Sequence, residues 1–180
     1  MSNRINTLAP GDGDEQPPRK SIRSFVLRAG RLTAAQKRAL ATLWPDYGLN
    51  SAAGLLEPAD AFARSAPVVV EIGIGNGDNL VDMAVAAPDK NFIGIEVHKP
   101  GIGHCLLRIE ETGAANVRLY CDDAVEILTR NLAPESLDRV NLFFPDPWHK
   151  KRHHKRRIVQ RDFVKLVASR LRPDGIFHVV

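Results

Sequence analysis

The sequence lacks any apolar run that approaches the roughly 18 residues needed to cross a bilayer, and its N-terminus has no apolar signal core. We therefore expect neither a membrane protein nor an exported one. Cysteine is also scarce, because the chain has 2, Cys105 and Cys121, and their separation fits neither a CxxC motif nor a metal site. This usage is typical of reduced core thiols in a cytoplasmic protein.

A metal-ligand set is missing as well. His149, His153 and His154 have near-helical spacing, but the neighbouring lysines and arginines would repel a dication. No cysteine or acid completes the set, so we expect no metal. The three other histidines stand alone in the sequence and are given no role.

One short segment of the chain has no acidic residue. The net charge of the 180 residues is only +4, yet the stretch from Lys150 to Arg157 holds six cations and no acid. Such a run is often no more than solvated surface. Here it lies between apolar segments, where self-repulsion is costly without an anionic partner, so it favours contact with nucleic acid.

The chain divides into three parts by composition. Residues 1–20 are rich in glycine, proline and polar side chains and are predicted to be a disordered tail. Residues 21–66 are predicted to form a basic arm and helices, with Thr33 capping a helix over 33–44 that Pro45 and Gly48 end. A second short helix is expected over 58–63. Residues 67–180 then form the main domain.

That domain alternates short β-branched runs with segments of helical apolar spacing, which indicates a doubly wound, mostly parallel α/β sheet. The predicted strands span 68–73, 91–97, 116–121, 137–144 and 176–180. The predicted helices span 78–87, 102–113, 123–132 and 156–171. Right-handed crossovers bring the C-terminal ends of all strands to one edge, where a ligand would bind. Because the last strand ends the sequence on apolar residues, either the chain is a fragment or something else covers this edge.

The first strand ends in the turn EIGIGNG, residues 71–77. Glycines let a backbone pass close to a ligand, although a tight strand-to-helix turn needs them too. The spacing of Gly73, Gly75 and Gly77 is GxGxG, so the dinucleotide pattern GxGxxG is absent. A carboxylate at Glu71 would repel a pyrophosphate but hold the ammonium of an amino acid, which favours S-adenosylmethionine over NAD.

Acids also follow the next two strands. Glu96, about 20 residues after the glycines, is placed to accept both hydroxyls of a ribose, with a plain surface acid as the alternative. Asp123 opens a helix and is a candidate both for the N-cap and for the adenine amino group. Asp122 is its rival for the contact with adenine.

The stretch FFPDPWHKKRHHKRR, residues 143–157, follows the fourth strand. Prolines after Phe144 and Asp146 bias both residues away from the right-handed helical region, so a stiff, extended turn should present the Asp146 carboxylate at the ligand edge. Such a turn also occurs for rigidity alone. Trp148 lies beyond the strand beside cations, where it can stack on a base or contact arginine.

These segments resemble the bacterial tRNA (guanine-N7-)-methyltransferase family (TrmB). The similarity covers about residues 21–180 and rests on EIGIGNG, GIEVHKPG (94–101), DDAVEIL, RSFVLRAGRLT (23–33), WPDYGL (44–49) and above all the PDPW-basic block. It implies a Rossmann-like class I methyltransferase fold, and methyl transfer from S-adenosylmethionine to N7 of a guanosine in the variable loop (position 46) of tRNA.

The resemblance also implies roles for individual residues. The cofactor would be bound by Glu71, Gly73, Gly75, Gly77, Glu96, Asp123 and Asp146, and Asp146 would also be catalytic. The substrate RNA would be contacted by Lys150, Arg152, His153, His154, Lys155, Arg156 and Arg157. The family's chain continues beyond this sequence with further substrate-binding residues.

Three other functions stay open at the level of sequence. Asp-Pro-Trp after the fourth strand is similar to the Asp/Asn-Pro-Pro-aromatic motif of enzymes that methylate exocyclic amines. A nonenzymatic RNA-binding module with a vestigial cofactor pocket is disfavoured by the intact acids, and an NAD oxidoreductase by the glycine spacing and Glu71. The oligomeric state is not fixed by the sequence, with a monomer as the working expectation.

Overall fold

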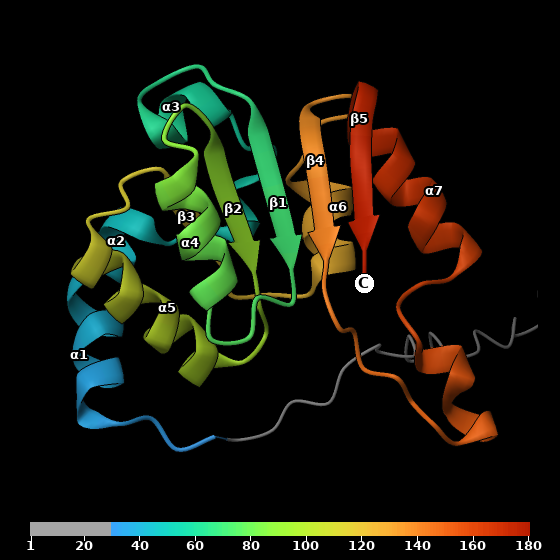
Figure 1. The fold of residues 1–180 in the computed structure, drawn as a ribbon, viewed down its shortest axis with the longest axis horizontal. Helices are drawn as coiled ribbons and strands as arrows, with labels where there is room; N and C mark the ends of the chain where they lie inside the picture. The colour runs from blue at the N-terminus through green and yellow to red at the C-terminus, as the bar shows by residue number, and fades with distance from the viewer. Residues whose placement is uncertain (1–29) are drawn as a thin grey trace, which may run out of the picture.

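The computed structural model describes residues 30–180, so the predicted tail over 1–20 and nearly all of the predicted arm over 21–32 lie outside the described residues. Its centre is a five-stranded parallel sheet in the order β3-β2-β1-β4-β5 (Figure 1). The strands are β1 (Val68–Ile72), β2 (Asn91–Ile95), β3 (Val117–Tyr120), β4 (Leu137–Leu142) and β5 (Leu171–Val179). The predicted α/β class and parallel sheet are confirmed.

Helices connect these strands and precede them. The α-helices are α1 (Ala34–Thr42), α2 (Trp44–Tyr47), α3 (Pro58–Phe62), α4 (Asp78–Ala86), α5 (Lys99–Thr112), α6 (Ala124–Arg130) and α7 (Arg161–Arg170). Two 3₁₀ helices, η1 (Ser51–Ala53) and η2 (Lys151–Arg156), complete the secondary structure of residues 30–180. None of the helices in this part of the chain is long and apolar enough to span a membrane.

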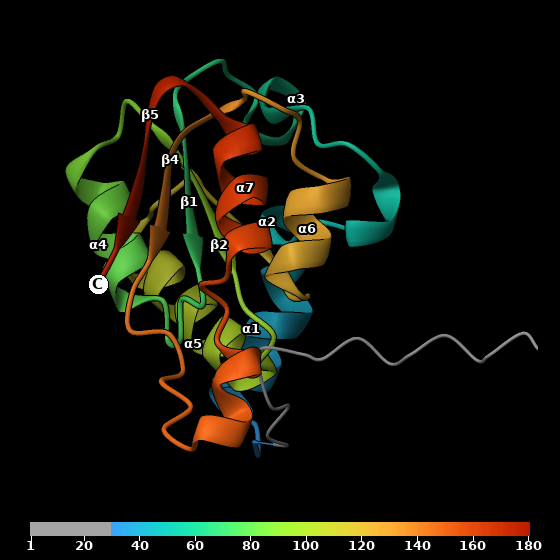
Figure 2. The ribbon, with the colours of Figure 1, turned by 90° about the vertical axis from the view of Figure 1, so that its right-hand side faces the viewer.

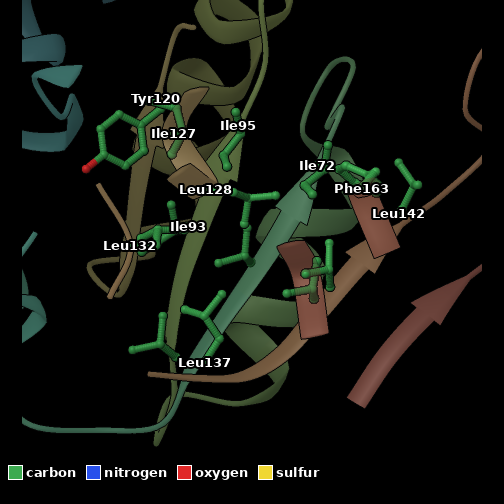
Figure 3. Close-up of a cluster of buried hydrophobic side chains, with 14 of the residues drawn as sticks. Ile72, Ile93, Ile95, Tyr120, Ile127, Leu128, Leu132, Leu137, Leu142 and Phe163 are labelled. Atoms are coloured by element: carbon green, nitrogen blue, oxygen red, sulfur yellow. The ribbon is translucent and has the colours of Figure 1, made fainter. Parts of the chain in front are cut away.

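The sheet is covered on both faces, with α4 on one side and α6 and α7 on the other (Figure 2). Side chains of a strand alternate between faces, so in β1 Val69 joins one apolar core while Val68 and Val70 join the other. Figure 3 shows the core beneath α6 and α7, which includes Ile93 and Phe163. The doubly wound arrangement fixes the strand ends at a single edge.

The helices before the sheet begin as predicted but end differently. Thr33 caps α1 in a capping box, because its hydroxyl accepts from the Gln36 N–H and the Gln36 side chain accepts from the Thr33 N–H. The predicted end of this helix at Pro45 is wrong. Pro45 stands in the first turn of α2, where its missing N–H costs nothing, and Gly48 follows the end of α2.

Two predicted boundaries near the C-terminus are also corrected. The helix predicted over 156–171 starts at Arg161, because η2 ends at Arg156 and the backbone at Arg157 and Gln160 is not helical. The strand predicted over 176–180 starts at Leu171 instead. Pro173, Asp174 and Gly175 lie within β5, where the pairing with β4 shifts register between Leu137 and Arg139. An irregular strand accommodates a proline that lacks a backbone donor.

Candidate functional site

A cavity of about 910 Å³ opens at the C-terminal edge of the sheet. Segments after β1, β2, β3 and β4 all contribute to its wall, as the topology predicts. Six of the predicted site residues line it, namely Gly73, Gly75, Glu96, Asp146, Lys150 and His153. The cavity is therefore lined by the glycine turn, by Glu96 at the C-terminal end of β2, and by the start of residues 150–157, which are called the basic segment from here on.

The three glycines of the turn after β1 serve two different purposes. Gly73 and Gly75 have φ values of 71° and 56°, which side chains rarely adopt, and a Cβ on either would meet no atom within 4 Å. Gly77 also has a positive φ, but a Cβ there would collide with the side chain of Cys105 on α5. Gly73 and Gly75 thus border the cavity, whereas Gly77 allows α4 to pack closely on α5.

Glu71 lies beneath this turn, at the end of β1, and is buried. Asn79 of α4 donates a hydrogen bond of 2.9 Å to its carboxylate. Burial raises the pKa of Glu71 to about 7, while the bond from Asn79 opposes the shift. The glycine turn therefore stands over a carboxyl group that titrates near neutral pH and does not itself line the cavity.

The Glu96 carboxylate is held by the backbone around it. One of its oxygens accepts from the Gly75 N–H at 2.9 Å, which ties the end of β2 to the glycine turn. Its other oxygen accepts from the N–H groups of Val97 and His98 at 2.8 and 3.0 Å. This fixes the carboxylate at the cavity wall with lone pairs left for a ligand.

The structure separates the two aspartates after β3. Asp123 is the N-cap of α6, where its carboxylate accepts from the N–H groups of Val125 and Glu126 at 2.8 and 3.4 Å. Asp122 lines the cavity instead, and its carboxylate accepts from the Ser51 hydroxyl at 2.8 Å. The N-cap alternative for Asp123 is therefore satisfied, and the rival Asp122 is the one on the cavity wall.

The loop after β4 presents Asp146 at the mouth of the cavity. Its first residue in left-handed conformation is Phe144, with φ 49°, and Trp148 follows with φ 41°. Phe144 is thus away from the right-handed helical region, as its following proline requires, but the turn is tighter than the predicted extended form. Asp146 is exposed between these two residues and lines the cavity.

The basic segment coils back over this loop as η2. Its His153 ring meets the Trp148 ring edge to face, with centroids 5.6 Å apart. Partial burial, followed by the charges of Arg152, Arg156 and other nearby cations, lowers the pKa of His153 and favours its neutral form. Lys151, Arg152 and Lys155 are exposed.

Two arginines of the segment contact the loop itself. The Arg156 guanidinium carbon lies 5.0 Å from the centroid of the Trp148 ring. The Arg157 Nε donates a hydrogen bond of 3.0 Å to the Pro147 carbonyl. Within residues 30–180, no three His, Cys, Asp or Glu side chains come together in a group that could hold a metal.

Sequence reasoning missed several wall residues, of which His98 and Phe143 are the clearest. His98 has no role on sequence grounds, yet it lines the cavity and precedes the first turn of α5. A positional rule would have found both, since residues within three positions of a parallel strand's C-terminal end lie at the ligand edge.

The comparisons with solved structures first define a class. The chain is similar in fold to a protein described as an antibiotic-related methyltransferase, with 19% identity, a TM-score of 0.53, and coverage of 69% of this chain and 63% of that one. A second match is a 16S rRNA (adenine(1408)-N(1))-methyltransferase from Catenulisporales acidiphilia, solved with its cosubstrate SAM, at 20% identity and a TM-score of 0.50. It covers 69% of this chain and 62% of that one. The fold is therefore that of class I methyltransferases, and residues 65–180 match the family described as putative methyltransferase.

Comparisons at the level of sequence narrow this class. The chain is 59% identical to the tRNA (guanine-N(7)-)-methyltransferase of Alcanivorax borkumensis over 89% of its own length and 67% of that protein's. It is 56% identical to the enzyme of the same name from Methylococcus capsulatus, over 90% and 69%. It is 53% identical to that of Saccharophagus degradans, over 89% and 70%. The chain belongs to the tRNA (guanine-N(7)-)-methyltransferase family and spans about two thirds of the length of these relatives.

Proposed function

We propose that this protein transfers a methyl group from S-adenosylmethionine to N7 of a guanosine in tRNA, and specifically in the variable loop. The observation that carries the proposal is the single cavity in which the glycine turn, Glu96 and Asp146 meet the first lysine of the basic segment. Family membership supports the same reaction, since the relatives are named for it. The activity belongs to the cytoplasm, where tRNA is modified, and residues 67–180 form its catalytic domain.

The cavity wall suits S-adenosylmethionine in size and chemistry. Its volume of about 910 Å³ is sufficient for a nucleoside with an amino-acid arm. The backbone at Gly73 and Gly75 has no side chain to obstruct such a ligand. Glu96 offers carboxylate lone pairs for ribose hydroxyls, and Glu71 beneath the turn attracts the ammonium group. Asp122 and Asp123 are the candidates for the adenine end.

The basic segment is the proposed contact with tRNA. Lys150 lines the cavity and would meet the substrate nucleotide. Of the residues that follow it along η2, His153 also lines the cavity, whereas Arg152, His154 and Lys155 lie outside the cavity wall. Lysines and arginines neutralise backbone phosphates, which positions an RNA without reading its bases. Contact between this segment and the loop of Asp146 supports a proposal in which RNA phosphates bind close to the reacting base.

The chemistry asks little of the protein beyond position and charge. Bound S-adenosylmethionine supplies an electrophilic methyl group on a sulfonium. N7 of guanine carries a free lone pair, so no side chain has to remove a proton before attack. The protein must align the two reactants and stabilise the positive charge that develops on the guanine ring. Asp146, exposed at the cavity mouth, supplies a fixed negative charge for this purpose.

One experiment tests this reaction directly. The protein is incubated with methyl-labelled S-adenosylmethionine and bulk tRNA, the RNA is digested, and the labelled nucleoside is identified. We expect 7-methylguanosine. Label in an N-methylated exocyclic amine would replace the proposed reaction by amine methylation, and absence of label with intact cofactor binding would reject the enzymatic proposal.

A further inference from the structure

Three of the six cations in the basic segment make a side-chain contact within the protein. Arg152 donates only to the ring of its neighbour His153, whereas Arg156 and Arg157 contact the loop of Asp146. Arg156 lies over the Trp148 ring and Arg157 donates to the Pro147 carbonyl, as described above. Both contacts fall on residues that immediately follow Asp146. By contrast, no hydrogen bond, ion pair or ring contact from residues 30–180 engages the side chain of Lys151 or Lys155, and both residues are exposed. The segment thus has two arginines that contact the loop and two lysines, called the outward lysines, that face solvent. Each pair carries the same charge.

The loop that carries Asp146 needs such support. Phe144 and Trp148 have positive φ values, and a left-handed conformation costs a non-glycine residue of the order of 1 kcal/mol or more, so it persists only where surrounding contacts impose it. The start of the loop is held by the backbone, because the Phe144 N–H donates to the Val180 carbonyl at 2.9 Å. The contacts of Arg156 and Arg157 hold its far end.

We propose that Arg156 and Arg157 are positioning residues that clamp the Pro147–Trp148 end of the loop and thereby fix the Asp146 carboxylate at the cavity. This inference rests on the proposed function, in which Asp146 faces the cofactor and the guanine. The basic segment then has two roles, since the outward lysines bind RNA phosphates while the last two arginines hold the loop. Because one segment both binds RNA and holds the loop, binding of RNA to the segment would affect the position of Asp146.

A measurement without RNA separates this role from phosphate binding. Affinity for S-adenosylmethionine is measured by calorimetry for the wild type, Arg157→Ala and Arg157→Lys. S-adenosylmethionine carries a net positive charge, so removal of a nearby cation should on electrostatic grounds leave its binding equal or tighter. Loss of a clamp predicts the opposite sign, with binding weaker by roughly three- to tenfold. Arg157→Lys should also weaken binding, since lysine keeps the charge but loses the rigid guanidinium geometry.

Measurements with RNA give the second half of the test. We expect single-turnover methylation at saturating tRNA and cofactor to fall about tenfold or more in Arg156→Ala and Arg157→Ala, because a displaced carboxylate loses its alignment. The slope of log affinity against log salt should stay that of the wild type in both variants. In Lys151→Ala combined with Lys155→Ala, the slope should decrease by roughly 0.7–0.9 for each phosphate that is no longer neutralised. Lys165→Ala, on the exposed side of α7, is the matched control for removal of a surface charge.

The opposite pattern would overturn the clamp. In that pattern, Arg157→Ala leaves cofactor affinity unchanged and lowers the salt slope, and Arg157→Lys has the salt slope of the wild type. Both arginines would then be phosphate ligands. The clamp can also be tested independently of the proposed reaction. In a Trp44→Phe background, which leaves Trp148 as the single tryptophan, Arg156→Ala should make Trp148 more accessible to acrylamide. Unchanged quenching would reject the contact, whereas increased quenching with no methylation by the wild type would reject only the proposed reaction.

Discussion

The two walls of the cavity are built by different means. On the β1–β2 side the backbone holds the functional group, because three N–H groups fix the Glu96 carboxylate and the glycine turn follows directly from the sheet. On the β4 side the loop of Asp146 leaves the sheet and is held at its far end by arginine side chains. Backbone contacts form with the fold, whereas side-chain contacts can break and re-form locally. The wall that we propose for the cofactor is thus held mainly by backbone contacts, and the wall that we propose for the substrate depends on side-chain contacts.

The largest expected effect is on the substrate wall. Asp146→Asn keeps the shape of the side chain but removes its charge, so methylation at saturating tRNA and cofactor should slow by about 10²-fold or more, as when other electrostatic stabilisers are removed. Cofactor affinity must be measured in the same variant, because Asp146 also lines the cofactor cavity. An active Asn variant would leave Asp146 as scaffolding only.

The same reaction should be insensitive to pH in the wild type. N7 carries a free lone pair and needs no deprotonation before attack, so the single-turnover rate with both substrates saturating should be nearly flat from about pH 6 to 8.5. A rate that rises tenfold per pH unit through neutrality would require a base. It would also redirect attention to an exocyclic amine as the methyl acceptor.

The next effect concerns the cofactor wall. Glu96→Ala should weaken S-adenosylmethionine binding by about 1.5–3 kcal/mol, because the variant cannot make a charge-assisted hydrogen bond to the ribose. The anchor of the Gly75 N–H disappears with it, so the turn itself should loosen. Binding of tRNA, measured without cofactor, should be unchanged. A variant that binds cofactor normally but tRNA poorly would reverse the assignment of the two walls.

A smaller effect should appear as a pH dependence of cofactor affinity. With a pKa of about 7, Glu71 is mostly protonated at pH 6 and cannot attract an ammonium without releasing a proton. Affinity should therefore fall by up to about tenfold from pH 7 to pH 6. Glu71→Gln, which can still accept from Asn79, should bind weakly with little dependence on pH. A wild-type affinity that is flat over this range would contradict the role of Glu71.

The stability of the ligand-free protein should depend on pH in the opposite sense, because it should decrease as the pH rises. Because burial raises the pKa of Glu71 above its ordinary value, the folded chain binds this proton more tightly than the unfolded chain. Its favourable contribution is complete below about pH 4.5 and is lost as the pH rises through about 7. In thermal unfolding at pH 8, Glu71→Gln should be more stable than the wild type, by up to about 3 kcal/mol.

The smallest effect separates the two aspartates after β3. Asparagine is as good an N-cap as aspartate, so Asp123→Asn should preserve both stability and cofactor affinity if Asp123 is a cap only. Asp122→Asn should weaken cofactor binding by about 1 kcal/mol, because a hydrogen bond at the cavity wall becomes weaker or is absent. The reverse ranking in calorimetry would assign adenine recognition to Asp123, as the family resemblance implies.

The sequence predicted most of the fold and part of the site. Strands and their edge were predictable, because β-branched runs such as residues 68–70 alternate with helical spacing and parallel crossovers have one hand. The start of α7 was not, because the apolar positions after Arg156 continue a helical period, although the backbone at Arg157 and Gln160 is not helical and the helix begins only at Arg161. The contacts of Arg156 and Arg157 were also beyond prediction. A run of like charges has no internal signal for which members turn inward, since that depends on where Trp148 lies after folding.

Cys105 packs closely beneath Gly77, so the reactivity of its thiol can report how often the glycine turn moves away from α5. Burial raises the pKa of this thiol to about 12, and only a thiolate reacts quickly with alkylating reagents. Modification of Cys105 therefore requires the first turn of α4 to separate from α5. With Cys121 replaced by serine, the alkylation rate of Cys105 would report how often the glycine turn opens. Bound cofactor should lower that rate.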